Sequence, residues 1–253
     1  MGNFVIWQIA GNEAKMIRNF LKKIIFKEKA TSESYIQYLR KLGMNIGEDC
    51  TIYAPKKTII DQQYPWLITI GNHVRITEGV ILLTHDYSWS VLKQIKVEES
   101  EGAILGASGE IVIGNNVFIG MNSIVLRGTY IGDNVIIGAG SVVSKNCESG
   151  WVYAGNPAKK IISVEEFYKK RKLVQLKEAK LLAQKYYERY GKKPGQEIFH
   201  EYFMLYENEI PKNKVYTNKM KLGNNYEKSC NYIKKHNTEF QSFEEFLKYC
   251  FEE

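Results

Sequence analysis

A strict period of six residues organises the chain between residues 113 and 143. Every sixth position in this stretch carries a β-branched aliphatic residue, in the series Ile113, Ile119, Val125, Ile131, Ile137 and Val143. An α-helix repeats its face every 3.6 residues and a β-strand every two, so neither element alone produces a period of six. A fixed repeat of this kind is typical of a solenoid, in which short units of the chain stack on one another.

The residues around each aliphatic explain the period. Glycine directly follows the aliphatic at residues 114, 120, 132 and 138, and a small or β-branched residue stands four places after the aliphatic each time. Short strands that each end at a Gly, Asn or Asp corner account for both features, because the aliphatic and the small residue then point inward. Three such strands close a triangular coil, and successive coils stack at about the 4.8 Å spacing of a β-sheet.

The winding is interrupted between Leu82 and Ile113. Positions 46, 52, 70, 76 and 82 share one phase of the repeat, whereas the series from residue 113 is offset by one residue. We therefore expect an inserted loop at about residues 86–108. A long loop that projects from a rigid solenoid is more often functional than structural.

The repeat resembles that of the left-handed parallel β-helix acyltransferases. Three further segments are similar to the maltose, galactoside and polysaccharide O-acetyltransferase branch of that family, namely Ile70-Gly71-Asn72, Thr84-His85-Asp86 and Gly155-Asn156-Pro157-Ala158-Lys159. The resemblance covers residues 43–162 and implies a mainly β fold, a left-handed parallel β-helix of hexapeptide repeats. The left hand is implied by the resemblance alone, because parallel crossovers in sheets are generally right-handed.

The segment before the repeat region is predicted to be helical. Residues 1–42 contain a basic amphipathic helix around residues 15–27 and a second helix from about Glu33 to Leu42, which ends at Gly43. The first helix suits either weak contact with an anionic membrane surface or packing against the β-helix or a neighbouring subunit.

We expect residues 163–253 to form a C-terminal α-helical extension. Its first helix is expected from Val164 to Tyr190, followed by a shorter aromatic helix at about 196–207, a polar connection rich in Lys and Asn, and a final helix from near Ser242. The extension lies outside the resemblance. Its role stays open between covering a trimer, shaping the acceptor site and binding a partner enzyme.

His85 is the expected catalytic residue. Transfer of an acetyl group from a thioester to a sugar hydroxyl needs a base, and an imidazole with a pKa near 6.5 can take the proton and then pass it to the leaving thiolate. The resemblance implies that the base stands at the matching Thr-His position, where the inserted loop begins. The alternative for His85 is a surface loop histidine without a task. Cys147 occupies an inward place in the repeat, which favours direct attack over an acyl-cysteine intermediate.

For the donor, the resemblance implies acetyl-CoA in a groove between subunits of a homotrimer, with no metal. The matching positions are Gly120, Met121 and Ala139 for the pantetheine arm, and Ser144, Lys145, Pro157 and Lys159 for the phosphate end. Lysine suits an anionic nucleotide. For the glycines, a requirement of the corner itself is an equal alternative.

The acceptor is expected to be a saccharide, nucleotide sugar or other glycan precursor. Asp86, Tyr87 and Trp89, in the inserted loop, suit either hydrogen bonding to and stacking on a sugar ring or simply holding the loop.

The charge of the chain permits an anionic partner without indicating nucleic acid. The 253 residues carry a formal net charge of +7, with a pI of about 9.0. No RRM, zinc-finger or helix-turn-helix signal accompanies this charge, so no nucleic-acid partner is expected. The four cysteines form no CxxC pair, no secretory cleavage pattern opens the chain, and no apolar run approaches the ~20 residues of a membrane span. These features predict a cytoplasmic protein with reduced thiols.

The sequence therefore predicts an acetyl-CoA-dependent O-acetyltransferase that acts on a hydroxyl of a saccharide or surface-polysaccharide precursor. Three alternatives stay open. One keeps the fold and donor but acetylates the nitrogen of an amino sugar. Another is a metal hydrolyase of the γ-carbonic anhydrase kind, which needs three histidine ligands although only His73 and His85 lie in the repeat region. The last is a non-catalytic scaffold that binds partners through the extension.

Overall fold

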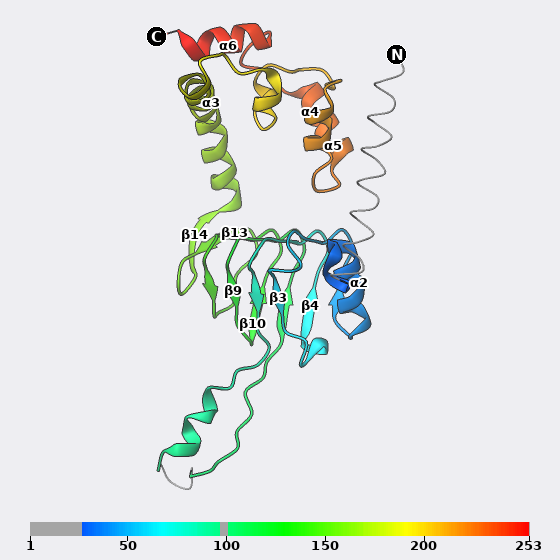
Figure 1. The fold of residues 1–253 in the computed structure, drawn as a ribbon, viewed down its shortest axis with the longest axis vertical. Helices are drawn as coiled ribbons and strands as arrows, with labels where there is room; N and C mark the ends of the chain where they lie inside the picture. Colours follow the sequence, from blue (N-terminus) through cyan, green and yellow to red (C-terminus); the bar gives the residue numbers. More distant parts are fainter. Residues whose placement is uncertain (1–26, 97–100, 253) are drawn as a thin grey trace. The chain divides into compact units, whose positions relative to one another are not determined.

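The computed structural model describes residues 27–96 and 101–252, and the chain divides after Glu165 into two compact units (Figure 1). We call the part up to Glu165 the β-helix unit and the part from Glu166 onward the helical unit. The basic amphipathic helix expected around residues 15–27, with its suggested membrane contact, lies essentially outside the described residues.

The β-helix unit is a left-handed parallel β-helix whose strands form three walls. From β1 to β12, successive strands along the chain fall on successive walls, so each of these coils contributes one strand to each wall. The first wall contains β1 (Asn45–Ile46), β4 (Ile68–Ile70), β7 (Ile111–Ile113) and β10 (Thr129–Ile131). The second contains β2 (Thr51–Ile52), β5 (Arg75–Ile76), β8 (Phe118–Ile119), β11 (Ile136–Ile137), β13 (Trp151–Ala154) and β14 (Lys159–Ser163). The third contains β3 (Ile59–Ile60), β6 (Ile81–Leu82), β9 (Ile124–Val125) and β12 (Val142–Val143).

The core of this unit follows the period read from the sequence. All six repeating aliphatics are buried, and so are the six residues that stand four places after them, Val117, Ser123, Thr129, Val135, Ser141 and Cys147. The two buried serines are satisfied, because the hydroxyls of Ser123 and Ser141 both donate to the carbonyl oxygen of Gly138, at 2.9 and 2.6 Å. The predicted inward orientation of both series is therefore confirmed.

One corner of the coils is held by a ladder of side-chain acceptors. The amide of Glu48 donates to Oδ1 of Asn72, the amide of Asn72 donates to Oδ1 of Asn115, and the amide of Asn115 donates to Oδ1 of Asp133, at 2.7, 2.8 and 2.5 Å. Glycine precedes these residues because the coils approach too closely for a side chain. A Cβ atom on Gly114 would lie 2.5 Å from Oδ1 of Asp133.

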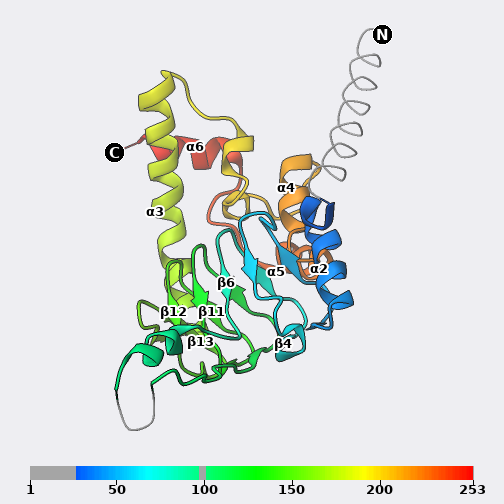
Figure 2. The same ribbon diagram turned by 60° about the horizontal axis from the view of Figure 1, so that its bottom comes forward.

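The ends of the stack are covered by α2 and by β13 with β14 (Figure 2). Helix α2 (Ser32–Lys41) follows a 3-10 turn, η1 (Lys27–Ala30), and buries Tyr35 and Leu39 in the core of the β-helix. Gly43 then adopts a φ of +109°, so the predicted helix with its glycine stop is confirmed. At the other end β14 turns back antiparallel to β13.

The helical unit has a hydrophobic core of its own, built largely from aromatic side chains such as Phe199, Phe203, Tyr216 and Phe246. Its elements are the continuation of α3 (Val164–Tyr190), the 3-10 turns η5 (Gln196–Phe199) and η6 (Phe203–Leu205), and the helices α4 (Lys214–Met220), α5 (Tyr226–Lys235) and α6 (Phe243–Phe251). The predicted first and last helices are confirmed, and the hydroxyl of Ser242 accepts a hydrogen bond from the amide of Glu245 at 3.2 Å, as an N-cap does.

Two expectations for the extension are wrong. The aromatic stretch at 196–207 forms two 3-10 turns instead of one helix, since Phe199, Phe203 and Leu205 are all buried and no single helical face holds them. The polar connection contains α4 and α5. These short helices bury few apolar side chains each, such as Tyr216 and Ile233, so lysines and asparagines dominate their composition. Within the described part of the chain no helix has the length and apolar character needed to cross a membrane.

Candidate active site

His85 lies where the third wall gives way to the inserted loop. The loop leaves the second coil after His85 and returns at Ser108, and these two residues form an antiparallel bridge. The amide of Asp86 donates to the carbonyl of Ala107 at 3.1 Å, and the amide of Gly109 donates to the carbonyl of Thr84 at 2.9 Å. These bonds close the root of the loop, so the backbone that carries His85 is fixed on both sides.

The imidazole of His85 is held by Asp61, one coil earlier in the stack. Nδ1 of His85 lies 2.5 Å from Oδ2 of Asp61, although 24 residues separate them. The contact follows from the register of the third wall, where Ile60 pairs with Leu82 and the amide of Asp61 donates to the carbonyl of Leu82. Asp61 therefore lies beside the segment that carries His85.

Asp61 is built to remain ionised. Its side chain is only 6% exposed, and its oxygens accept hydrogen bonds from the amide and the hydroxyl of Thr84 at 3.0 and 2.5 Å and from the amide of Gln63 at 2.9 Å. Burial by itself raises the pKa of Asp61, but the hydrogen bonds from Thr84, Gln63 and His85 outweigh burial and the pKa lies below its ordinary value.

This arrangement prepares His85 to accept a proton. An ionised carboxylate can only accept, so Nδ1 of His85 carries hydrogen and Nε2 has the free lone pair. The side chain of His85 is 31% exposed. The edge of Tyr64 packs against the imidazole, with ring centroids 5.9 Å apart, and Trp66 packs against Tyr64 at 5.7 Å. An oriented base beside an exposed aromatic surface suits proton abstraction from a hydroxyl of a ring-shaped substrate.

Asp61, Tyr64 and Trp66 were not singled out from the sequence. They lie in the irregular stretch between β3 and β4, which includes the 3-10 turn η2 (Pro65–Leu67). Two signals identify Asp61. It directly follows the inward Ile60, and it precedes His85 by about one coil, so the register brings the two side chains together.

The loop residues proposed for the acceptor lie just beyond the root. Asp86 accepts hydrogen bonds from the hydroxyl of Ser88 at 2.5 Å and from Nε of Arg127 at 2.7 Å, and these bonds, that from Ser88 foremost, lower the pKa of Asp86 to about 2. Tyr87 and Trp89 pack edge to face, with centroids 4.7 Å apart. The structure thus gives Asp86 partners in the loop and in the next coil, while sugar contact by Asp86, Tyr87 and Trp89 stays a prediction.

Five of the seven residues proposed for acetyl-CoA fall on two neighbouring corners of the β-helix, on either side of the third wall. Gly120 and Met121 follow β8, and Ala139 follows β11 directly above them. The amide of Gly140 donates to the carbonyl of Met121 at 2.7 Å. The turn that contains Pro157 packs on β12, the last strand of the third wall, because the amide of Ala158 donates to the carbonyl of Val142 at 2.8 Å.

Ser144 and Lys145 lie on the other corner. They follow β12. The amide of Leu83 donates to the carbonyl of Val125, and the amide of Leu126 donates to the carbonyl of Val143. These hydrogen bonds align the ends of the strands of the third wall, so Ser144 and Lys145 lie on the same corner as His85. Lys159 is exposed in β14, opposite Ala154. Met121, Ala139, Ser144, Lys145 and Pro157 are exposed and Gly120 is buried. A Cβ atom on Gly120 would lie 2.5 Å from the amide nitrogen of Ala139, so the stacking of the coils itself requires this glycine.

Two other features bear on the alternatives. Across residues 27–96 and 101–252, no three His, Cys, Asp or Glu side chains are arranged to hold a metal ion. His73 contacts Oδ2 of Asp49, and Nη2 of Arg75 shares that carboxylate at 3.0 Å. This second Asp–His pair also spans 24 residues, but it lies at the start of the second wall and not at the root of the loop.

Known proteins share this repeat. The model of the bacterial transferase hexapeptide (six repeats) matches residues 110–145. Protein CapG of Staphylococcus aureus is 44% identical over 149 residues, which cover 58% of this chain and 81% of CapG. A chloramphenicol acetyltransferase of Klebsiella aerogenes is 32% identical over 126 residues, covering 45% of this chain and 58% of that enzyme.

A crystal structure of a maltose O-acetyltransferase from Clostridium difficile 630 is 24% identical, covers 60% of this chain and 84% of that chain, and has a TM-score of 0.42. The likeness to CapG spans most of that protein, and the family model matches the coils that follow the inserted loop. The chain belongs to the hexapeptide-repeat acetyltransferase family.

Proposed function

We propose that this acetyltransferase moves an acetyl group from acetyl-CoA to a hydroxyl of a saccharide or surface-polysaccharide precursor. The observation that carries the proposal is the Asp61–His85 pair at the root of the loop, with its 2.5 Å contact. An oriented base of this kind is what an alcohol acceptor needs, because a hydroxyl is a weak nucleophile until its proton is taken.

The proposed reaction is a direct transfer. Nε2 of His85 takes the proton of the acceptor hydroxyl while the hydroxyl oxygen attacks the thioester carbonyl. The C–S bond then breaks, and the imidazolium returns the proton to the thiolate of coenzyme A. Asp61 keeps Nδ1 protonated throughout and stabilises the positive ring, as the carboxylate of a catalytic triad does.

Burial of Cys147 argues against a covalent acyl-enzyme. Its side chain lies in the core of the late coils and is 2% exposed. Burial raises the pKa of this thiol to about 11, so little thiolate forms near neutral pH. Because the thiolate is the nucleophilic form, direct attack by the acceptor is the simpler route.

The exposed corners suit the donor. Lys145 and Lys159 offer cations for the phosphate end of acetyl-CoA, and the Met121 and Ala139 corner offers exposed backbone beside small residues for the pantetheine arm. Met121, Ala139 and Lys145 flank the third wall, so a donor that contacts all of them crosses that wall.

The outer face of the third wall supports a homotrimer as the working form. Its outward side chains are all aliphatic, and the strand register aligns them in one column, Ile59, Ile81, Ile124 and Val142. Ile59 is 54% exposed. A flat aliphatic column of this kind favours burial against another copy of the chain, which brings a second subunit to the wall that the donor crosses.

The test is thiol release from acetyl-CoA with a panel of neutral sugars, amino sugars and capsular glycans, comparing wild type with His85→Ala. We expect acceptor-dependent release that falls by about two to four orders of magnitude in the variant. His73→Ala is the matched control, because it also loses a histidine from an Asp–His pair but away from the loop, and it should keep wild-type rates.

The chemistry of the product separates the two acceptor classes. An O-acetyl ester is cleaved by alkaline hydroxylamine, whereas an N-acetyl amide is not. If the products are stable to hydroxylamine, the enzyme acetylates the nitrogen of an amino sugar and the proposed O-acetylation is wrong. Undiminished transfer by His85→Ala would remove His85 from the mechanism.

A further inference from the structure

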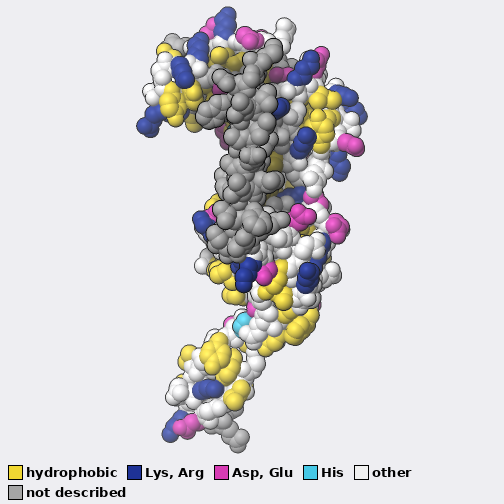
Figure 3. Space-filling model, turned by 45° about the vertical axis from the view of Figure 1, so that its right-hand side comes forward, with side chains coloured by type: hydrophobic (Ala, Val, Ile, Leu, Met, Phe, Trp, Pro, Cys, Tyr) yellow, Lys and Arg dark blue, Asp and Glu magenta, His cyan; other side chains and the backbone are white. Residues whose placement is uncertain are grey.

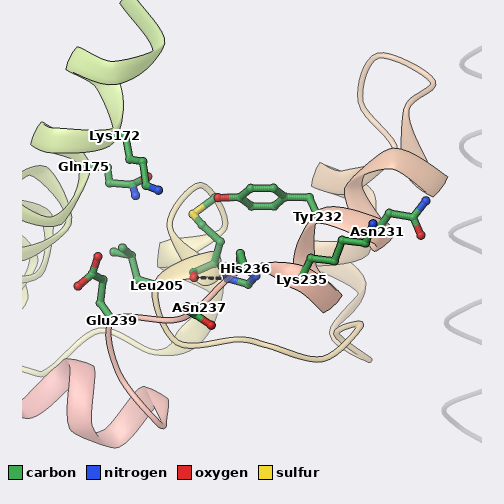
Figure 4. Close-up of a pocket in the computed structure, with 10 residues that line it drawn as sticks. Lys172, Gln175, Leu205, Asn231, Tyr232, Lys235, His236, Asn237 and Glu239 are labelled. Atoms are coloured by element: carbon green, nitrogen blue, oxygen red, sulfur yellow. Dashed lines mark hydrogen bonds between the residues drawn. The ribbon is translucent and has the colours of Figure 1, made fainter.

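The helical unit carries a groove that the transfer chemistry does not use (Figure 4). A pocket of about 580 Å³ lies between α3, η6, α5 and the segment that follows α5. Two smaller pockets, of about 340 and 320 Å³, lie beside it, and Tyr232 lines all three. The three hollows therefore adjoin one another around this side chain, and we call them together the groove.

Tyr232 is a fixed aromatic surface at the centre of the groove. Its ring stacks on the imidazole of His236, with centroids 5.0 Å apart and an interplanar angle of 17°. That imidazole is itself anchored, because Nδ1 lies 2.8 Å from the carbonyl oxygen of Ile233 and Nε2 lies 2.8 Å from that of Met204. Tyr232 remains 46% exposed and points from α5 toward the α3 side of the pocket (Figure 4).

Amide and ammonium groups line the same pocket as this ring. Gln175 comes from α3, Asn231 from α5 and Asn237 from the segment after α5, and Lys172 and Lys235 flank the same pocket. A stacking surface with neighbouring amides is well suited to a sugar, whose ring has an apolar face and whose hydroxyls both donate and accept.

The charges of the groove favour an anionic ligand. Within the described residues, Lys172, Lys228 and Lys235 form no ion pair, whereas Lys219 is paired with Glu201 and Arg171 with Glu178. Glu201 and Glu239 also line the groove. The unpaired lysines therefore favour an anionic polymer, and Tyr232 with the neighbouring amides favours one that is built of sugar rings.

We propose that this groove is a second, non-catalytic glycan site that holds a segment of an acidic polysaccharide. The identity of the polymer as the acceptor rests on the proposed function, while binding itself does not. Holding the chain at a second point raises the local concentration of acceptor hydroxyls, so transfer to polymer gains over transfer to a free sugar.

The experiment uses the full chain and oligogalacturonate as the probe, with binding measured by calorimetry at fixed ionic strength. The test variant is Lys172→Gln with Lys235→Gln, and the matched control is Lys177→Gln with Lys212→Gln, which removes two exposed lysines of the same unit outside the groove. We expect affinity for oligogalacturonate to fall at least tenfold in the test variant and to stay unchanged in the control. Tyr232→Leu should give a similar loss, with circular dichroism checking that the unit remains folded.

Two further probes decide the ligand class. A neutral maltooligosaccharide should bind much more weakly than oligogalacturonate. If wild type bound single-stranded RNA more tightly than oligogalacturonate, and the lysine variant lost this RNA binding, the ligand would be a nucleic acid instead of a glycan. Equal loss of oligogalacturonate binding in test and control variants, or no binding to wild type, would overturn the site.

Activity separates this inference from the proposed function. The lysine variant should transfer acetyl to a small sugar at the wild-type rate and lose rate only on polymer. A chain that binds oligogalacturonate through these lysines but releases no thiol with any acceptor would overturn the proposed function and keep the groove. Normal transfer to polymer by the lysine variant would overturn the groove's role and keep the proposed function.

Discussion

Oδ2 of Asp61 lies 2.5 Å from Nδ1 of His85 and accepts, in the same place, the amide and hydroxyl of Thr84. One buried carboxylate thus fixes both the orientation of the imidazole and the strand end that carries it. Because all of these groups donate to Asp61, a side chain of the same size that can also donate does not reproduce the arrangement.

Asp61→Asn is therefore expected to lower kcat about as strongly as loss of the base itself, by roughly two to four orders of magnitude. Asparagine would place its single oxygen where the donors of Thr84 and His85 converge and its amide group against the amide of Gln63, so the hydrogen bond from Gln63 and the negative charge that stabilises the imidazolium are both lost. Steady-state kinetics should show the fall in kcat with little change in KM for acetyl-CoA, since Asp61 follows β3, three coils away from Ser144 and Lys145 along the same corner.

Asp49→Asn is the control for that substitution, because Asp49 contacts His73 in the second Asp–His pair. It should leave kcat unchanged. If Asp49→Asn and Asp61→Asn reduce kcat equally, Asp61 acts only through stability, and the pair with His85 has no special place in the reaction.

The sequence alone predicted the coils because a single physical rule repeats along them. Each inward aliphatic needs only its own position in the period, so Ile119 or Val143 is assigned without knowing the rest of the fold. The role of Asp61 could not be predicted from the repeat, because it depends on the register between two coils and on an irregular turn between β3 and β4. Helices α4 and α5 were not predicted for a different reason: their buried faces consist of few residues, such as Tyr216 and Ile233, among many lysines.

The inserted loop should loosen in acid through Asp86. Hydrogen bonds from Ser88 and Arg127 lower the pKa of Asp86 to about 2, from an ordinary value of 3.8. A depressed folded-state pKa gives a stabilisation that is fully present above pH 4 and is lost as pH falls from about 4 to about 2, because the unfolded chain binds the proton first. Thermal unfolding of wild type and Asp86→Asn, measured across this range, should converge at low pH.

Asp86 is exposed, so this difference should also shrink in high salt. As a second measurement, limited proteolysis near neutral pH should cut the loop of Asp86→Asn faster than the loop of wild type, because the charged hydrogen bond to Arg127 in the next coil is lost. Parallel curves for the two proteins at every pH would show that Asp86 does not stabilise the loop.

Gly114→Ala should destabilise the β-helix by about 1–3 kcal/mol, the usual cost of overpacking a close contact. The new methyl would lie 2.5 Å from Oδ1 of Asp133 and 2.9 Å from the backbone carbon of Gly132, and this backbone cannot move without disturbing the ladder above it. Gly106→Ala is the matched control, because no atom outside its chain neighbours lies within 4 Å of its Cβ position. Chemical denaturation should show a lower midpoint for Gly114→Ala and no shift for Gly106→Ala.

The aliphatic column on the third wall offers a direct test of assembly. Ile124→Glu places a charge in the middle of that column, between Ile81 and Val142, and burial of an unpaired carboxylate against another subunit would cost several kcal/mol. We expect light scattering coupled to size exclusion to find wild type as a trimer and Ile124→Glu as a monomer. Tyr130→Glu is the control, since Tyr130 is 48% exposed on the outer face of the first wall and should tolerate the charge. Activity should fall with the trimer if the donor lies between subunits, whereas a fully active monomer would place the whole donor site on one chain.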